Sequence, residues 1–238
     1  MQDEMDDLAK KNIGKIRIGV QTTLSDLLIC HVMPKFVTQY PNICVCITED
    51  TSTRIMEQVR QYQLDAAIST RVPDSDLYYT EELVRMEHVL LLRKDHPLVE
   101  MAVDKPGFCK RWIDLDWCRN ERFIAMHPGQ NPRKDIEQSM SSVWNDLNIA
   151  MEVRSMRSII EAVSNGLGIA AVSSGINLLY ADHWDNLVSL SYGEEPYIMS
   201  YYLFHYKDIY MGVPLRCFLE LTKQQLKARI TADTHDLI

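Results

Sequence analysis

The sequence predicts an α/β protein built from two lobes, each with a mixed, mainly parallel sheet flanked by helices. Strand-like and helix-like segments alternate over the first 70 residues, and a second alternating series begins near residue 123. Extended segments separate the two series. Alternating strands and helices favour parallel strands joined by right-handed crossovers. Two such series joined by extended segments therefore indicate two lobes with a cleft between them.

The first series contains three predicted strands. Residues 15–20 alternate charged and apolar side chains, and residues 43–48 and 65–70 are short and largely apolar, as strands are. The helix after the first strand carries Pro34, which either interrupts the helix or begins its second half. The segment 51–53, Thr-Ser-Thr, can cap the next helix.

The stretch 155–172 predicts a helix, a stop and a buried strand. The helix begins at Ser158, which opens a capping box, or one turn earlier at Ser155. Gly166 ends it, because glycine adopts the left-handed conformation of a helix C′ position without a steric penalty. Residues 167–172 contain no polar side chain and are too few for a helix, so they predict a strand covered on both faces.

The rest of the second series follows the same pattern. A strand is predicted over 123–126 and a loop over 127–132, followed by a helix with an apolar face made of Ile136, Met140, Val143, Trp144 and Leu147. Further extended segments are expected at 77–80, 88–92, 187–190 and 197–204, with a loop at 94–98. The last helix has an apolar stripe comprising Leu215, Phe218, Leu219, Thr222 and Leu226.

Composition narrows the class of protein. The chain has 238 residues, 46% of them hydrophobic and 24% charged, which is ordinary for a soluble globular protein. A net charge of −8 would repel a nucleic-acid backbone. No apolar run approaches the roughly 20 residues that span a bilayer, and the acidic N-terminus is unlike a signal peptide, so we expect a cytoplasmic protein. Six cysteines are too sparse for a disulfide scaffold and should stay reduced.

Five segments in order resemble the effector-binding domain of LysR-type transcriptional regulators. The resemblance covers about residues 13–222. The matching segments are GKIRIGV at 14–20, PKFVTQYP at 34–41, QLDAAI at 63–68, DHPL at 95–98 and VSNGLGIA at 163–170. Each segment alone is a common α/β fragment, whereas all five in family order are fairly specific.

The resemblance implies a periplasmic-binding-protein-like (type 2) fold in which two crossing strands form a hinge. Lobe I would comprise 13–87 and 193–238, lobe II would comprise 88–192, and 1–12 would be a linker remnant. The family is bacterial and cytoplasmic, forms homodimers or homotetramers, and binds a small-molecule effector in the cleft. It binds DNA through an N-terminal winged helix-turn-helix that is missing from these residues. We expect no enzymatic activity, cofactor or metal.

Ligands of open α/β sheets bind beyond the carboxyl ends of the strands, near helix N-termini that favour anions. A small carboxylate is therefore the expected effector. The polar residues predicted at such ends are Thr22, Thr23, Thr51, Ser52, Thr70, His127, Gln130, Ser155 and Arg157. The hydroxyl residues can also serve only as helix caps, and Arg157 can be a solvated surface residue.

Other functions are kept as alternatives. Cys44 and Cys46 share one face of a strand and can hold a soft metal, although small core hydrophobes are the favoured interpretation. Cys109 and Cys118 lie in a polar segment that should be exposed, where redox sensing is conceivable. A solute-binding protein would need an export signal or lipid anchor. An enzyme on this fold would need clustered titratable groups, and no hydrolase, phosphate-loop or zinc-protease motif is present.

Overall fold

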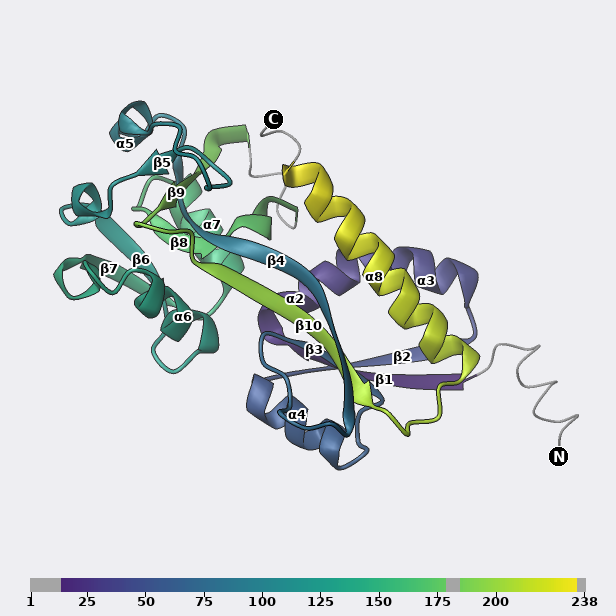
Figure 1. Ribbon diagram of the computed structural model, residues 1–238. Coiled ribbons are helices and arrows are strands. Elements are labelled where there is room, and N and C mark those ends of the chain that lie inside the picture. Colours follow the sequence, from purple (N-terminus) through teal and green to yellow (C-terminus); the bar gives the residue numbers. More distant parts are fainter. Residues whose placement is uncertain (1–13, 179–184, 235–238) are drawn as a thin grey trace, which may run out of the picture. The chain divides into compact units, whose positions relative to one another are not determined.

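The computed structural model describes residues 14–178 and 185–234 (Figure 1). The predicted linker remnant at 1–12 lies outside these residues. Contacts divide the chain into two compact units, the first formed by the described residues up to Arg85 with Ser200–Ala232, and the second by Met86–Met199. The division falls after Arg85 and after Met199, whereas the lobe limits expected from the sequence fall after residues 87 and 192 and stay predictions.

The first unit has the β-α-β-α-β start that the sequence predicts. Strands β1 (Gly14–Gln21), β2 (Ile43–Asp50) and β3 (Ala66–Ser69) lie in the order β2-β1-β3. Both β2 and β3 pair parallel to β1, whereas β10 (Ile198–Tyr206) pairs antiparallel to β3. The sheet is therefore mixed, and all three predicted strands are confirmed within a few residues.

Helices of the first unit pack their apolar stripes against this sheet. The first helical segment runs through α2 (Thr22–Leu27), a π-helical turn at Leu28–Val32 and α3 (Met33–Gln39). Pro34 stands at the start of α3, so the prediction that it begins the second half of the helix is confirmed. The wider π-helical turn before it accommodates a residue without an N–H. Helix α8 (Val213–Thr234) lies beside α3 (Figure 1), and the Phe36 and Phe218 rings meet edge to face at 5.1 Å.

Two long strands pass from one unit into the other. They are β10 and β4 (Tyr78–Arg93), which are neighbours in the sheet. The extended segments predicted at 77–80 and 88–92 are both parts of β4, which continues through the charged residues between them. The loop predicted at 94–98 contains the start of α5 (Pro97–Met101). The expected pair of connecting strands is confirmed.

In the second unit, β4 pairs antiparallel with β8 (Ala170–Ser173) and with β9 (Leu187–Tyr192). Two short elements, β5 (Trp112–Ile113) and the 3-10 turn Leu115–Cys118, complete this side. A separate parallel pair consists of β6 (Arg122–Met126) and β7 (Asn148–Val153). β8 begins three residues later than predicted but is buried on both faces, since Ala171 joins one apolar cluster while Ala170 and Val172 join another.

Helices of the second unit differ in length from expectation. α6 (Asn131–Ser139) ends well before Leu147, and a 3-10 turn at Trp144–Asp146 takes over. Met140 and Val143 are nevertheless buried, so the apolar spacing indicated the core and not the length of the helix. Another 3-10 turn covers Ser174–Leu178.

Helix α7 (Met156–Ser164) starts at the earlier of its two predicted positions, with Ser155 as N-cap. It ends as predicted at Gly166, whose φ is 72°. The Gly166 and Leu167 N–H groups donate to the carbonyls of Val163 and Ala162 at 2.9 and 3.0 Å. This is the Schellman arrangement, which needs a left-handed residue at this point.

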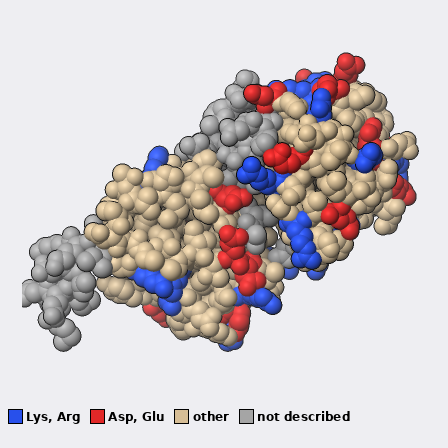
Figure 2. Space-filling model, turned by 180° about the vertical axis from the view of Figure 1, so that it is seen from behind, with Lys and Arg blue, Asp and Glu red and all other residues tan. Residues whose placement is uncertain are grey.

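Charged side chains of both signs are interspersed on the face shown in Figure 2. Basic side chains do not form one continuous stripe on that face. None of the described helices is long and apolar enough to cross a membrane. A negative net charge and mixed surface charge do not favour binding of a phosphate backbone by these residues.

Candidate functional site

A buried amide organises the carboxyl ends of β1 and β3. Gln21 ends β1 and is 3% exposed. Its Oε1 accepts hydrogen bonds from Ser52 Oγ at 3.2 Å and from Thr70 N and Oγ1 at 3.2 and 3.0 Å. Ser69 Oγ donates to Ser52 Oγ at 2.8 Å. Two residues predicted for the site, Ser52 and Thr70, are thus brought together by Gln21, which sequence reasoning missed.

The start of α4 (Ser52–Arg60) supplies the second side of this cluster. Thr51 is the N-cap and its hydroxyl accepts from Arg54 N at 3.4 Å, so Thr51 caps the helix as predicted. Ser52 is buried and its hydroxyl donates to Gln21. Ser52 therefore holds Gln21 in place, while the half-exposed Thr70 is the hydroxyl residue at the surface of the cluster.

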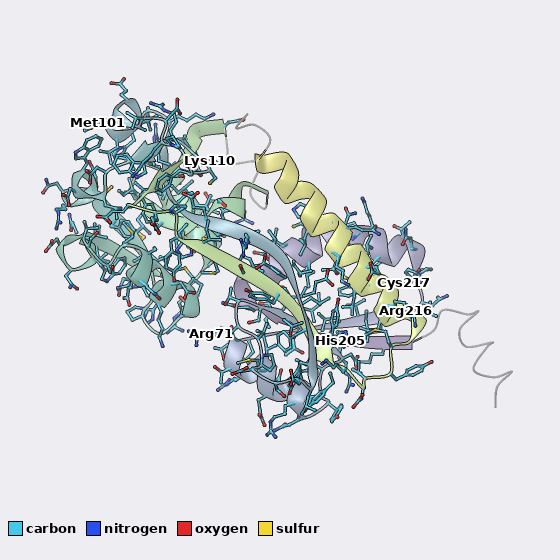
Figure 3. The ribbon with its side chains drawn as sticks, in the orientation of Figure 1. Arg71, Met101, Lys110, His205, Arg216 and Cys217 are labelled. Atoms are coloured by element: carbon cyan, nitrogen blue, oxygen red, sulfur yellow. The ribbon has the colours of Figure 1, made fainter. Side chains whose placement is uncertain are left out.

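A cation follows directly after Thr70. Arg71 lies on the loop after β3 (Figure 3), and its backbone N–H donates to Ser69 Oγ at 3.2 Å. Its side chain is exposed. A guanidinium with free donors can bind a carboxylate through two parallel hydrogen bonds. Arg71 was also missed by sequence reasoning, although its position one residue beyond a predicted strand end could have identified it.

For two predicted residues, Thr22 and Thr23, the structure describes the backbone but not the side chains. The backbone of Thr22 and Thr23 forms the first turn of α2, but their side chains lie outside the described residues. Nearby, Ser25 Oγ donates to Glu49 Oε1 at 2.7 Å. The predicted contacts of Thr22 and Thr23 with an effector stay predictions.

In the second unit, the carboxyl ends of the parallel pair β6 and β7 bring three predicted residues together. The His127 N–H donates to Val153 O at 2.7 Å, and Gln130 Nε2 donates to Arg154 O at 3.0 Å. Gln130 Oε1 is buried without a partner among the described residues. Ser155 follows directly after Arg154. These hydrogen bonds therefore place His127, Gln130 and Ser155 near one another at the ends of β6 and β7.

Arg133 fixes the geometry of that turn. It is 8% exposed, and its Nη1 donates to Met126 O at 2.7 Å and to Glu152 Oε1 at 3.0 Å. Its Nε donates to Glu137 at 2.7 Å, and its guanidinium stacks 4.5 Å from the Trp144 ring. A buried arginine needs such a complete set of partners. Sequence reasoning missed Arg133 because its burial depends on how α6 packs against β6 and β7.

Arg157 lies on an exposed face of α7. A groove of about 410 Å³ on that face is lined by Ser155, Arg157, Ser158, Glu161, Ala162, Asn165 and Leu167. Arg157 is largely exposed and its Nε lies 3.8 Å from Glu161 Oε1. This arrangement agrees with a solvated surface arginine, and its predicted contact with an effector stays a prediction.

The cysteines considered for redox sensing are not placed for it. Cys118 is fully buried and Cys109 is half-buried, contrary to the expected exposure. Burial raises the pKa of each thiol to about 12, with a hydrogen bond to Glu87 adding to the effect at Cys109. Both are therefore protonated at neutral pH, whereas reactive cysteines are thiolates.

Comparison with known proteins identifies the family. The family model described as the LysR substrate binding domain matches residues 9–227. The chain belongs to the LysR substrate-binding domain family. A probable RuBisCO transcriptional regulator from Trieres chinensis is 27% identical over 176 residues, covering 71% of this chain and 55% of the relative. The chain thus spans about half the length of the curated relatives it matches.

Solved structures of the family share the fold. The CcmR regulatory domain of Synechocystis PCC6803 in complex with 2-PG has a TM-score of 0.71 and 20% identity, covering 90% of this chain and 98% of that one. The effector-binding domain of QuiR in complex with shikimate has a TM-score of 0.63 and 19% identity, with 91% and 98% covered. The predicted two-lobed, periplasmic-binding-protein-like α/β fold is thereby confirmed.

Proposed function

We propose that this LysR effector-binding domain senses a small carboxylate at the carboxyl ends of β1 and β3, with Gln21, Thr70 and Arg71 as contacts. The observation that carries this proposal is the hydrogen-bond cluster around the buried Gln21, next to an exposed guanidinium. The Gln21 oxygen accepts three bonds from the protein, so its NH2 group, with two donors, is directed away from Ser52 and Thr70.

Electrostatics at the cluster favour an anion. The N-terminus of α4 presents the positive end of the helix dipole. Arg71 adds a full positive charge one residue from Thr70. The ligands of the two related structures, 2-phosphoglycolate and shikimate, both carry a carboxylate, which supports the same chemical class for this chain.

The sensing role implies a regulatory protein larger than these residues. We propose that DNA is bound by a winged helix-turn-helix outside them, that the regulator acts as a cytoplasmic homodimer or homotetramer, and that it catalyses no reaction. Effector binding would shift the balance between two arrangements of the regulator. The size of that shift is limited by the difference in effector affinity between the two arrangements.

A thermal-shift screen tests the proposal. Small carboxylates, including 2-phosphoglycolate and shikimate, are added at millimolar concentration, and at 100 times its Kd a ligand raises the free energy of unfolding by about 2.7 kcal/mol. Arg71→Gln should weaken the effective ligand at least about tenfold, since a charge-assisted pair contributes about 1.5–3 kcal/mol.

Arg60→Gln is the matched control, because Arg60 is exposed in the last turn of α4, at the end of that helix away from the cluster, and pairs with Glu57. It should leave the shift unchanged. If no carboxylate stabilises the protein, the sensing proposal is wrong. If one does but Arg71→Gln binds it as the wild type does, only the site assignment is wrong.

A further inference from the structure

Cys44 and Cys46 form an exposed pair of thiols on an edge strand. They lie two residues apart on β2, the outermost strand of the order β2-β1-β3, and therefore share a face. Their Sγ atoms are 3.8 Å apart. Cys44 is exposed and Cys46 is partly exposed, so their interpretation as core hydrophobes was wrong.

The distance between the sulfurs distinguishes two uses of the pair. A disulfide needs an S–S distance of about 2.05 Å and Cα atoms usually about 4.4–6.8 Å apart. Residues i and i+2 of a strand are about 6.6–6.8 Å apart, at the upper limit of that range. Two thiolates bound to one tetrahedral ion at about 2.3 Å each lie about 3.8 Å apart. The pair is therefore spaced for a bridging cation and would have to move to form a disulfide.

Neighbouring charges do not prevent such binding. Lys15 and Arg17 of β1 lie opposite Cys44 and Cys46 in the parallel register. Arg17 is neutralised by Asp65, whose Oδ1 lies 2.5 Å from its Nη2. Lys15 is exposed and favours a nearby thiolate. The hydrogen bond with Cys46 raises the pKa of Cys44, so a metal that binds Cys44 must displace the thiol proton.

We propose that Cys44 and Cys46 chelate one thiophilic cation, either Zn²⁺ or Cu⁺. Thiolates select these ions over hard cations such as Mg²⁺. The described residues contain no group of three or more potential metal ligands, so the site consists of two thiolates and solvent completes the coordination of Zn²⁺. Cu⁺ held by two thiolates alone is near-linear, so the two sulfurs would have to move farther apart to bind it in that way. This proposal does not depend on the effector site.

Metal titration of the reduced protein under argon tests the proposal. Cd²⁺ serves as a spectroscopic probe through thiolate-to-metal charge-transfer absorption, while Zn²⁺ and Cu⁺ are each titrated in competition with a chromogenic chelator. We expect one ion per chain and a release of protons on binding. Cys44→Ser and Cys46→Ser should each weaken binding at least about tenfold, because each removes one of two ligands. An ion that the chelator withholds completely from the protein is excluded as the ligand of this pair.

Cys30→Ser is the matched control, since Cys30 is also an exposed thiol but is not part of the pair. It should bind metal as the wild type does. Equal binding by Cys30→Ser, Cys44→Ser and Cys46→Ser would overturn the proposal. So would the absence of charge-transfer absorption, or oxidation of the pair to a disulfide in place of metal binding, seen as a loss of about 2 Da in the intact mass.

Discussion

At the scale of single residues, tertiary partners decide which polar side chains form the site. Ser52 and Thr70 could be predicted because hydroxyl residues at strand ends are visible in the sequence. Gln21 could not, because a glutamine after a strand is usually solvated, and its burial depends on partners 31 and 49 residues away. Arg133 was missed because its burial depends on the packing of α6 against β6 and β7.

His88 predicts a pH dependence of stability. Burial lowers its pKa from 6.5 to about 4. Between pH 6.5 and 4 the unfolded chain therefore binds a proton at His88 that the folded protein does not bind. The contribution of neutral His88 to the free energy of unfolding is complete above pH 6.5 and is lost as the pH falls toward 4. We expect a loss of about 3 kcal/mol in the free energy of unfolding from His88 over that range, measured by urea denaturation at several pH values.

His88→Gln serves as the comparison, because glutamine does not titrate. Its stability should fall less steeply between pH 6.5 and 4 than that of the wild type. Equal slopes in the two proteins would show that His88 is not buried as a neutral imidazole.

At the scale of elements, sequence patterns located most strands and helices but misjudged some lengths. β7 was missed although Ile149, Met151 and Val153 recur at every second position, because these residues are only half-buried and the residues between them are exposed. α6 was predicted too long because apolar spacing continued through the 3-10 turn after it. The periodicity of apolar residues reports burial, whereas backbone hydrogen bonding decides where a helix ends.

Gly168, in the turn after α7, is a position where adding a side chain should destabilise the backbone of a neighbouring strand. A Cβ at this position would clash with the Arg122 carbonyl oxygen and lie 3.0 Å from its carbon. Because these are backbone atoms of β6, relief requires movement of the strand. We expect Gly168→Ala to lower the free energy of unfolding by about 1–3 kcal/mol, measured by urea denaturation.

Gly14→Ala provides the matched control for this prediction. A Cβ at Gly14 would meet only the Ile43 side chain, at an ordinary 3.6 Å. Its effect should stay within about 0.5 kcal/mol. If the two variants are equally stable, β6 is not packed against the residue before Ile169 as described.

At the scale of the whole molecule, net charge limits what the chain binds. The charge of −8 and the mixed surface in Figure 2 oppose binding of DNA by these residues alone. We expect no change in fluorescence anisotropy when the protein is added to labelled duplex DNA at about 0.1 M salt. Salt-sensitive binding would contradict this account and would indicate a basic surface on these 238 residues.

The central claim is that a small carboxylate binds at the cluster around Gln21. Its most direct test is calorimetric titration of the carboxylate that stabilises the protein most, comparing wild type, Thr70→Val and Thr53→Val. Thr70 donates to Gln21, whereas Thr53 is an exposed threonine on α4. We predict that Thr70→Val raises the Kd at least about fivefold, since a lost hydrogen bond costs about 1 kcal/mol, and that Thr53→Val leaves it unchanged. Equal Kd values for all three proteins would contradict the claim.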